Sequence, residues 1–222
     1  MSNPPTPPRG EALAAALVQA SRALIEAEGF AAFNLRAVTR AVGVSQPAVY
    51  RHFPSREALL QAVMLDGYGD FDRAAVAAAG EDEPYGRLHR LGVAYVEFAA
   101  HNPGWFRLVF GRRDAVANAS AGVHAIPQGQ ALVLSAFARL LDPEHCAFGA
   151  HYRAWWGLVH GLSFLVIERV FQLVDTDEAR VRAAAAAIAV HIDGLRARFG
   201  TPRPATAHSP QALFGALQSG LG

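Results

Sequence analysis

The residues best suited to chemistry lie between positions 29 and 56, where four arginines occur and no acidic residue does. The whole chain of 222 residues carries a net charge of only +1, so this cluster is a local positive patch. The four arginines are Arg36, Arg40, Arg51 and Arg56. Guanidinium groups gathered in this way can neutralise phosphates, which supply most of the non-specific affinity of a protein for nucleic acid.

Polar side chains lie among these arginines and could distinguish one base from another. Gln46 can form a bidentate hydrogen bond with a base edge, preferably adenine, while Pro47 can touch a thymine methyl group. Tyr50 and His52 carry donors that could reach phosphate oxygens. The segment therefore combines candidate base contacts with candidate phosphate contacts.

Two short helices are needed to position these side chains. Asn34 is a suitable N-cap for a helix over residues 35–42, Gly43 suits a tight turn, and Ser45 begins a second helix with Pro47 in its first turn. Helices this short need tertiary packing. The apolar residues that would supply it are Leu35, Val38, Val42, Val44, Val49 and Phe53. The pattern predicts a helix-turn-helix, whose second helix can enter a DNA major groove about 12 Å wide.

This segment resembles the TetR family of bacterial transcriptional repressors, also called TetR/AcrR. The resemblance covers residues 11–65 and rests on ALIEAEGF, LRAVTRAVGVSQPAVYRHF and SREALL, in order and at the family's spacing. It implies that residues 45–47 face bases, that Arg36 meets a base or a phosphate, and that Thr39 holds a phosphate. It also implies that Tyr50, His52 and Arg56 clamp phosphates, although the family often has Lys where Arg56 stands. The full set of predicted DNA-binding residues is Arg36, Thr39, Ser45, Gln46, Pro47, Tyr50, Arg51, His52 and Arg56.

The rest of the chain has helical periodicity and no segments that pair as strands, which predicts an all-α protein of about nine helices. We expect a flexible tail over residues 1–9, a helix-turn-helix domain over 10–56 with its motif at 34–53, and a second tail over 201–222. By the family resemblance, residues 57–200 form a larger helical domain that binds a small molecule and dimerises. The helix that begins near Ser55 would join the two domains and act as a lever.

One stretch of the second domain, AWWGLVHGLSFL at residues 154–165, resembles the Trp-His-Gly signature of one class of TetR C-terminal domains. Core packing of an aromatic residue against a hydrogen-bonded histidine explains the same pattern. Aromatic residues could line an apolar ligand pocket, although such stripes are also typical of plain core. The predicted ligand-binding residues are Trp105, Phe106, Phe110, Phe137, Trp155, Trp156, His160 and Phe164.

Dimerisation is expected on independent grounds. A single helix-turn-helix reads too few base pairs to be specific in a genome, whereas two-fold pairing sets two reading helices about 34–36 Å apart, one turn of DNA. Two long helices expected near residues 143–173 and 178–199 would supply a self-complementary face. The predicted interface residues are Leu158, Leu162, Leu165, Ile188, Ile192 and Leu195.

Other function classes find little support in the sequence. No G-x-S-x-G, H-E-x-x-H, C-x-x-C, G-x-G-x-x-G or P-loop motif occurs, so we predict that the chain is no enzyme and has no cofactor. The group of His145, Cys146 and His151 points in different directions on a helix, so no metal is expected.

The single cysteine and the lack of a membrane-spanning segment suggest a cytoplasmic protein without a membrane partner. We predict a homodimeric, ligand-responsive repressor that binds a palindromic double-stranded DNA operator and is released by a small-molecule effector. The alternative is a helical protein-interaction or ligand-binding module without sequence-specific DNA binding.

Overall fold

The structure is a computed structural model that describes residues 10–80, 83–111, 127–170, 176–204 and 208–219. Within these ranges the regular elements are ten α-helices and one short 3₁₀ turn, and no strand occurs. The all-α prediction is confirmed, with one helix more than expected. The tail predicted over residues 1–9 lies outside the described residues.

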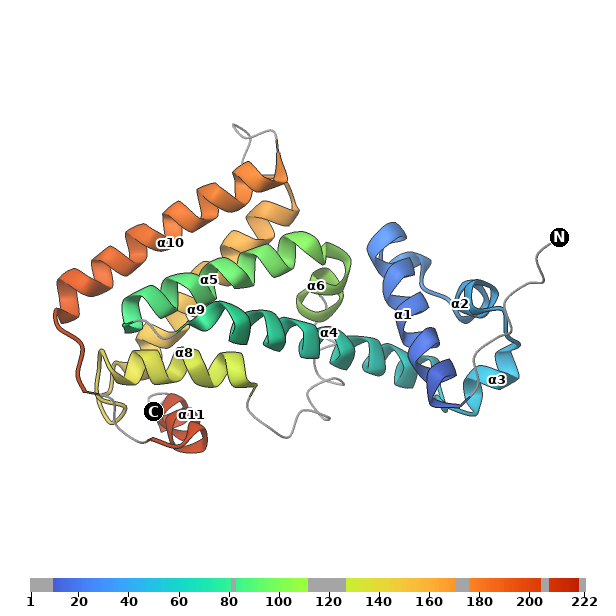
Figure 1. The fold of residues 1–222 in the computed structure, drawn as a ribbon, viewed down its shortest axis with the longest axis horizontal. Helices are drawn as coiled ribbons and strands as arrows, with labels where there is room; N and C mark the ends of the chain where they lie inside the picture. The colour runs from blue at the N-terminus through green and yellow to red at the C-terminus, as the bar shows by residue number, and fades with distance from the viewer. Residues whose placement is uncertain (1–9, 81–82, 112–126, 171–175, 205–207, 220–222) are drawn as a thin grey trace. The chain divides into compact units, whose positions relative to one another are not determined.

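The chain divides into two compact units, each made of two separate stretches of sequence. Figure 1 colours the ribbon by residue number, so these stretches can be found by their colours. Unit 1 comprises Met1–Gly69 and Asn102–Val123, and unit 2 comprises Asp70–His101 and His124–Gly222. The division falls within helix α4 (Arg56–Ala79), and helix α6 (Pro103–Phe110) groups with the N-terminal part of the chain. The functional boundary expected at residue 56 stays a prediction.

Unit 1 holds the predicted helix-turn-helix. Helix α1 (Glu11–Glu28) is followed by the turn η1 (Phe30–Ala32), helix α2 (Leu35–Val42), helix α3 (Gln46–Tyr50) and the start of α4. Figure 1 shows α2 and α3 beside α1. The core that joins the four helices includes fully buried side chains from each of them, namely Leu17, Ile25, Val38, Val49 and Leu59.

Unit 2 is a bundle around helix α5 (Pro84–His101), which packs against α8 (Gln128–Ala138), α9 (Phe148–Ile167) and α10 (Asp177–Phe199). Gly92 lets α9 and α10 approach closely, because a Cβ there would lie 3.1 Å from Val159 and 3.3 Å from Ile188. Both of these neighbours are fully buried. The bundle core therefore forms where α5, α9 and α10 meet.

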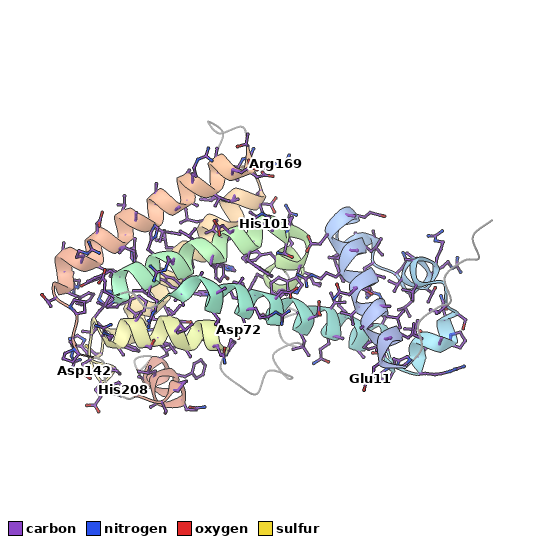
Figure 2. The ribbon with its side chains drawn as sticks, in the orientation of Figure 1. Glu11, Asp72, His101, Asp142, Arg169 and His208 are labelled. Atoms are coloured by element: carbon purple, nitrogen blue, oxygen red, sulfur yellow. The ribbon has the colours of Figure 1, made fainter. Side chains whose placement is uncertain are left out.

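A carboxylate on α4 caps one helix of this bundle. Asp72, labelled in Figure 2, accepts the backbone N–H groups of Gln128 at 3.2 Å and Gly129 at 2.7 Å. These two N–H groups lie in the first turn of α8, where the helix itself offers no acceptor. Asp72 thus fixes α8 on the unit 2 part of α4.

The C-terminal segment differs from the expected tail. Residues 210–219 form helix α11 (Pro210–Ser219), which packs on α8 and α9 and buries Leu213 and Leu217. The preceding segment is tied to the end of α8, since Arg203 pairs with Asp142 at 3.0 Å and its backbone N–H donates to Arg139 O at 2.7 Å. Figure 2 labels Asp142 close to His208, the residue at which the last described range, 208–219, begins. The described part of this segment is therefore an integral layer of unit 2.

Candidate nucleic-acid interface

The turn that sets α3 on α2 is built from local hydrogen bonds. The Asn34 side chain accepts the Ala37 N–H at 2.8 Å, which caps α2 as predicted. Gly43 ends the helix with φ +75°, a left-handed conformation that suits glycine. The N–H groups of Gly43 and Val44 both donate to Thr39 O, at 2.9 and 3.0 Å. These bonds and the buried Val38 and Val49 determine which side of α3 faces outward.

The outward side of α3 carries the predicted reading residues. Ser45, Gln46 and Pro47 are exposed, and Tyr50 is 50% exposed, which is unusual for an aromatic side chain. Among the described residues, neither Gln46 nor Tyr50 forms a side-chain hydrogen bond. Polar groups without internal partners on one short helix are available to an external partner.

Three of the four arginines in this segment are also exposed. Arg36, Arg40 and Arg51 are exposed, and no carboxylate of the described residues pairs with them. With no acid between residues 29 and 56, their charges are uncompensated nearby. The α2–α3 segment therefore carries exposed positive charge without an internal partner in the described ranges, as expected of a phosphate-binding face.

Two of the predicted phosphate-binding side chains, Thr39 and Arg56, form contacts within the protein. Thr39 is only 6% exposed and its hydroxyl donates to Arg36 O at 3.1 Å, so its side chain is hydrogen-bonded within α2 and its phosphate contact stays a prediction. Arg56 stacks over the rings of Phe30 and Phe33, 5.5 and 4.9 Å from their centroids, and donates to Phe33 O. Its guanidinium joins η1 to α4 as a cation–π contact, and its phosphate contact stays a prediction.

His52 is half-buried just beyond α3, and its backbone N–H donates to Val49 O at 2.9 Å. The sequence signal that could have indicated the Arg56 contact is the pair Phe30 and Phe33, which lie in η1 and directly after it.

The predicted ligand-binding residues divide between the units. Trp105 and Phe106 are buried in unit 1, where the Trp105 ring packs edge-on against Tyr68 at 5.1 Å. A Cβ on Gly67 would overlap the Trp105 indole, so this ring fills a notch in α4. Phe110 is half-buried and packs against the Trp105 and Phe106 rings, with centroids 6.3 and 4.8 Å apart. Ligand contact at these three residues stays a prediction.

The other candidates belong to unit 2. Phe137 and Trp155 are buried with ring centroids 6.4 Å apart. The indole N–H of Trp155 has no hydrogen-bond acceptor within the described part of the chain. A buried donor without an acceptor is costly, so it marks a place where a ligand atom would be favourable. Ligand contact at these two residues stays a prediction.

The Trp-His-Gly stretch forms an aromatic ladder on α9. His160 stacks on Trp156 with centroids 4.7 Å apart, meets Phe164 edge-on at 5.2 Å, and its Nδ1 lies 2.9 Å from the Tyr95 hydroxyl of α5. Burial lowers the pKa of His160 below its ordinary value. His160 therefore packs between α5 and α9 with a hydrogen bond to Tyr95, as the core-packing interpretation expects. Trp156 is 40% exposed.

A pocket that sequence reasoning missed lies between α5 and α10. It has a volume of about 370 Å³, and none of the predicted aromatic residues lines it. Its lining residues are Glu97, Ala100, His101, Asp177, Glu178, Val181 and Arg182. The mixed charges of this lining differ from the apolar character expected of the effector site.

The predicted dimer interface needs correction. Leu162, Ile188, Ile192 and Leu195 are buried within unit 2, so they belong to the protomer core. Leu158 is half-buried, and Leu165 is exposed. The exposed apolar residues of the two helices include several small side chains together with Trp156 and Leu165. They are Ala154, Trp156, Gly157, Gly161 and Leu165 on α9, and Ala186, Val190, Gly194 and Ala197 on α10.

Among the described residues, no group of three or more His, Cys, Asp or Glu side chains is placed to hold a metal ion. Cys146 is exposed, with its sulfur 4.0 Å from His145 Nδ1. Within the same ranges, no helix has both the length and the apolar character needed to cross a membrane.

Comparison with known proteins points to one family at both ends of the chain. Residues 17–63 match the model for bacterial regulatory proteins of the tetR family. Residues 88–191 match the model for a tetracyclin repressor-like C-terminal domain. The two matches lie on the helix-turn-helix and on the helical bundle, respectively.

Individual relatives agree with these models. The chain is 26% identical over 169 residues to the HTH-type transcriptional regulator Rv0681 of Mycobacterium tuberculosis, described as uncharacterized, covering 72% of this chain and 73% of the relative. It is 30% identical over 99 residues to the nucleoid occlusion factor SlmA of Marinobacter nauticus, which covers 44% of this chain and 49% of that protein.

Solved structures share the fold. A TetR-family transcriptional regulator from Pectobacterium atrosepticum has a TM-score of 0.57 and 25% identity, covering 87% of this chain and 97% of that one. A TetR variant from Acinetobacter baumannii in complex with minocycline has a TM-score of 0.51 at 15% identity, covering 83% and 97%.

Proposed function

The chain belongs to the TetR family of bacterial transcriptional regulators, and on this premise we propose that it is a ligand-responsive repressor. In this proposal a homodimer binds a palindromic operator in cytoplasmic DNA, and a small molecule releases it. The observation that supports it most directly is the exposed side of α3, where Gln46 and Tyr50 have no partner among the described residues and three arginines lie nearby. Such a surface combines base readout with phosphate neutralisation.

Homodimer formation is proposed through the outward side of α9 and α10. Val190 is 73% exposed, and a Cβ added at Gly157, Gly161 or Gly194 would meet nothing within 4 Å. An exposed apolar side of this kind suits a second copy, because the small residues let two helix pairs approach closely and exclude water. Two-fold pairing would then place two α3 helices on successive turns of DNA.

Effector response is proposed to act through α4. This helix is continuous from Arg56 to Ala79, while the division between the units falls after Gly69. Gly67 and Gly69 lower the intrinsic stability of the helix near that point. A small molecule bound in unit 2 would shift the population of α4 states, with a coupling of about 1–3 kcal/mol typical of such effects.

The proposal is tested by selecting duplexes from a random pool with the full-length protein and measuring binding by electrophoretic mobility shift. We expect enrichment of a palindrome whose half-sites lie one helical turn apart, and release of the duplex by one compound in a library of apolar small molecules. Enrichment of no sequence would favour the alternative function, a helical protein-interaction or ligand-binding module.

A further inference from the structure

The first turn of α6 is held by a carboxylate on α1. Glu26 accepts the Gly104 N–H at 2.7 Å with one oxygen and the Trp105 N–H at 2.8 Å with the other. These N–H groups have no acceptor within their own helix, and negative charge is favoured at a helix N-terminus. One turn earlier on α1, Arg22 donates to Asn102 Oδ1 at 2.8 Å and to Asp66 of α4 at 3.0 Å. The segment from residue 102 to 105 is thus bonded to α1 at both of its ends.

Two glycines allow the start of α6 to lie close to α1 and α4. A Cβ on Gly104 would lie 2.5 Å from Ile25 O, and one on Gly67 would overlap the Trp105 indole. The Trp105 indole N–H in turn donates to Met64 O of α4 at 3.3 Å. The start of α6 therefore fits between α1 and α4 without room for one more methyl group.

We propose that Glu26 is a positioning residue for DNA binding, because it makes α6 part of the same body as the helix-turn-helix. This inference rests on the proposed function. Glu26 lies on α1, which packs against α2 as well as α6. Because α1 contacts both α6 and α2, holding the start of α6 against α1 also stabilises the position of α1 under the helix-turn-helix.

Chain connectivity gives this bond a regulatory consequence. Helix α5 of unit 2 ends at His101, and the next residue, Asn102, is the one that Arg22 holds. A displacement at the end of α5 is therefore carried through one peptide bond into the turn that Glu26 caps. Because a carboxylate offers two acceptors for two successive N–H groups, Gln at this position would satisfy only one of them.

The first test measures amide hydrogen exchange in the full-length protein. We expect exchange at Gly104 and Trp105 to become about ten- to a hundredfold faster in Glu26→Ala, since each lost bond is a charge-assisted one. Glu26→Gln should give an intermediate rate. Glu28→Ala is the matched control: it removes the same charge from an exposed position two residues further along α1, and should leave both amides unchanged.

The second test measures affinity for the duplex that the wild-type chain selects from a random pool. Glu26→Ala should weaken binding about tenfold, and Glu26→Gln should restore part of the loss in step with amide protection. Gly104→Ala retains the carboxylate but cannot be seated against Ile25 O, so it should weaken binding as Glu26→Ala does. In wild type, bound duplex should further slow exchange at Gly104 and Trp105, and this slowing should be absent from Glu26→Ala.

Two results would overturn the positioning role alone. One is unchanged exchange at Gly104 and Trp105 in Glu26→Ala. The other is fast exchange in Glu26→Ala together with duplex affinity equal to that of Glu28→Ala. If the wild-type chain enriches no duplex, the proposed function fails and the positioning role fails with it. If far-UV circular dichroism shows that Glu26→Ala does not fold, both measurements are made on Glu26→Gln and Gly104→Ala instead.

Discussion

Arginines close together in the sequence have different roles in the structure. Arg51 is exposed beside α3 with no carboxylate partner among the described residues, whereas Arg56 stacks on Phe30 and Phe33 and donates to a backbone carbonyl. The Arg51 guanidinium has no internal contact in the described part of the chain to hold it, whereas the Arg56 guanidinium is held between η1 and the start of α4. Residue type alone does not separate these roles, because the difference arises from which neighbours the fold brings within reach.

The proposed base contact of Gln46 is testable at a single operator position. Gln46→Ala should relax the preference for one base, at a cost of about 1–3 kcal/mol for the preferred sequence. The measurement is the affinity for a set of duplexes that vary one position at a time. Gln211→Ala, an exposed change on α11, is the control. An unaltered preference in Gln46→Ala would remove this residue from the reading surface.

The proposed phosphate contact of Arg51 has a different signature. Arg51→Ala should weaken binding to all duplexes alike and reduce the slope of log K against log salt by about 0.9, the value for one phosphate contact. Arg182→Ala removes an exposed arginine from α10 and should leave the slope as in wild type. Equal slopes for Arg51→Ala and wild type would contradict the contact.

At the scale of elements, helices α9 and α10 show why periodicity alone misplaced the dimer interface. Large apolar residues at helical spacing were expected to face a second copy, but Ile188 and Leu195 face α5 and the rest of the protomer core. The exposed apolar residues are glycines and alanines on both helices, Trp156 and Leu165 on α9, and Val190 on α10. A helix that is apolar on two sides has to bury one of them within its own protomer, and the larger side chains gain most from that burial.

The revised interface is tested with Val190→Asp. A carboxylate at the centre of the exposed side of α10 should raise the dimer dissociation constant at least about tenfold, because it would be buried without a partner. Analytical ultracentrifugation over a range of protein concentrations measures the change. Val76→Asp, an equivalent change at an exposed valine of α4, should leave association intact. Equal dissociation constants for the two variants would place the interface elsewhere.

Helix α11 should contribute to the stability of unit 2. Leu213 is buried against the bundle, so Leu213→Ala should lower the free energy of unfolding by about 2–4 kcal/mol, as expected for a buried leucine replaced by alanine. Urea unfolding followed by circular dichroism gives this value. Ala212→Ser, at the exposed neighbouring position, should have little effect. A loss below about 0.5 kcal/mol would mean that α11 is docked only loosely.

At the scale of the whole molecule, three half-buried histidines link stability to pH. Burial lowers the pKa of His160 and His191, and burial together with Arg198, His191 and His145 lowers that of His151. Below pH 6.5 the unfolded chain therefore binds protons that the folded chain does not. The stability that these groups contribute is complete above about pH 6.5 and decreases as the pH falls through their lowered folded pKa values.

We accordingly expect the urea midpoint of unfolding to be lower at pH 5.5 than at pH 7.5. His160→Gln should reduce this difference, because glutamine does not titrate and can still meet the Tyr95 hydroxyl. The two midpoints are measured in matched buffers at the same ionic strength. A midpoint that is equal or higher at pH 5.5 in wild type would contradict the predicted direction.

Family, fold class and the reading surface were determined by the sequence itself. The Asn34 cap, the turn at Gly43 and the outward position of Gln46 and Tyr50 depend on hydrogen bonds and packing within some twenty residues, so local pattern sufficed to predict them. Tertiary structure alone decided that Thr39 points inward, that the large residues of α10 form the protomer core, and that Glu26 holds α6. The last of these bonds joins residues 78 positions apart, and local periodicity contains no information about partners at that separation.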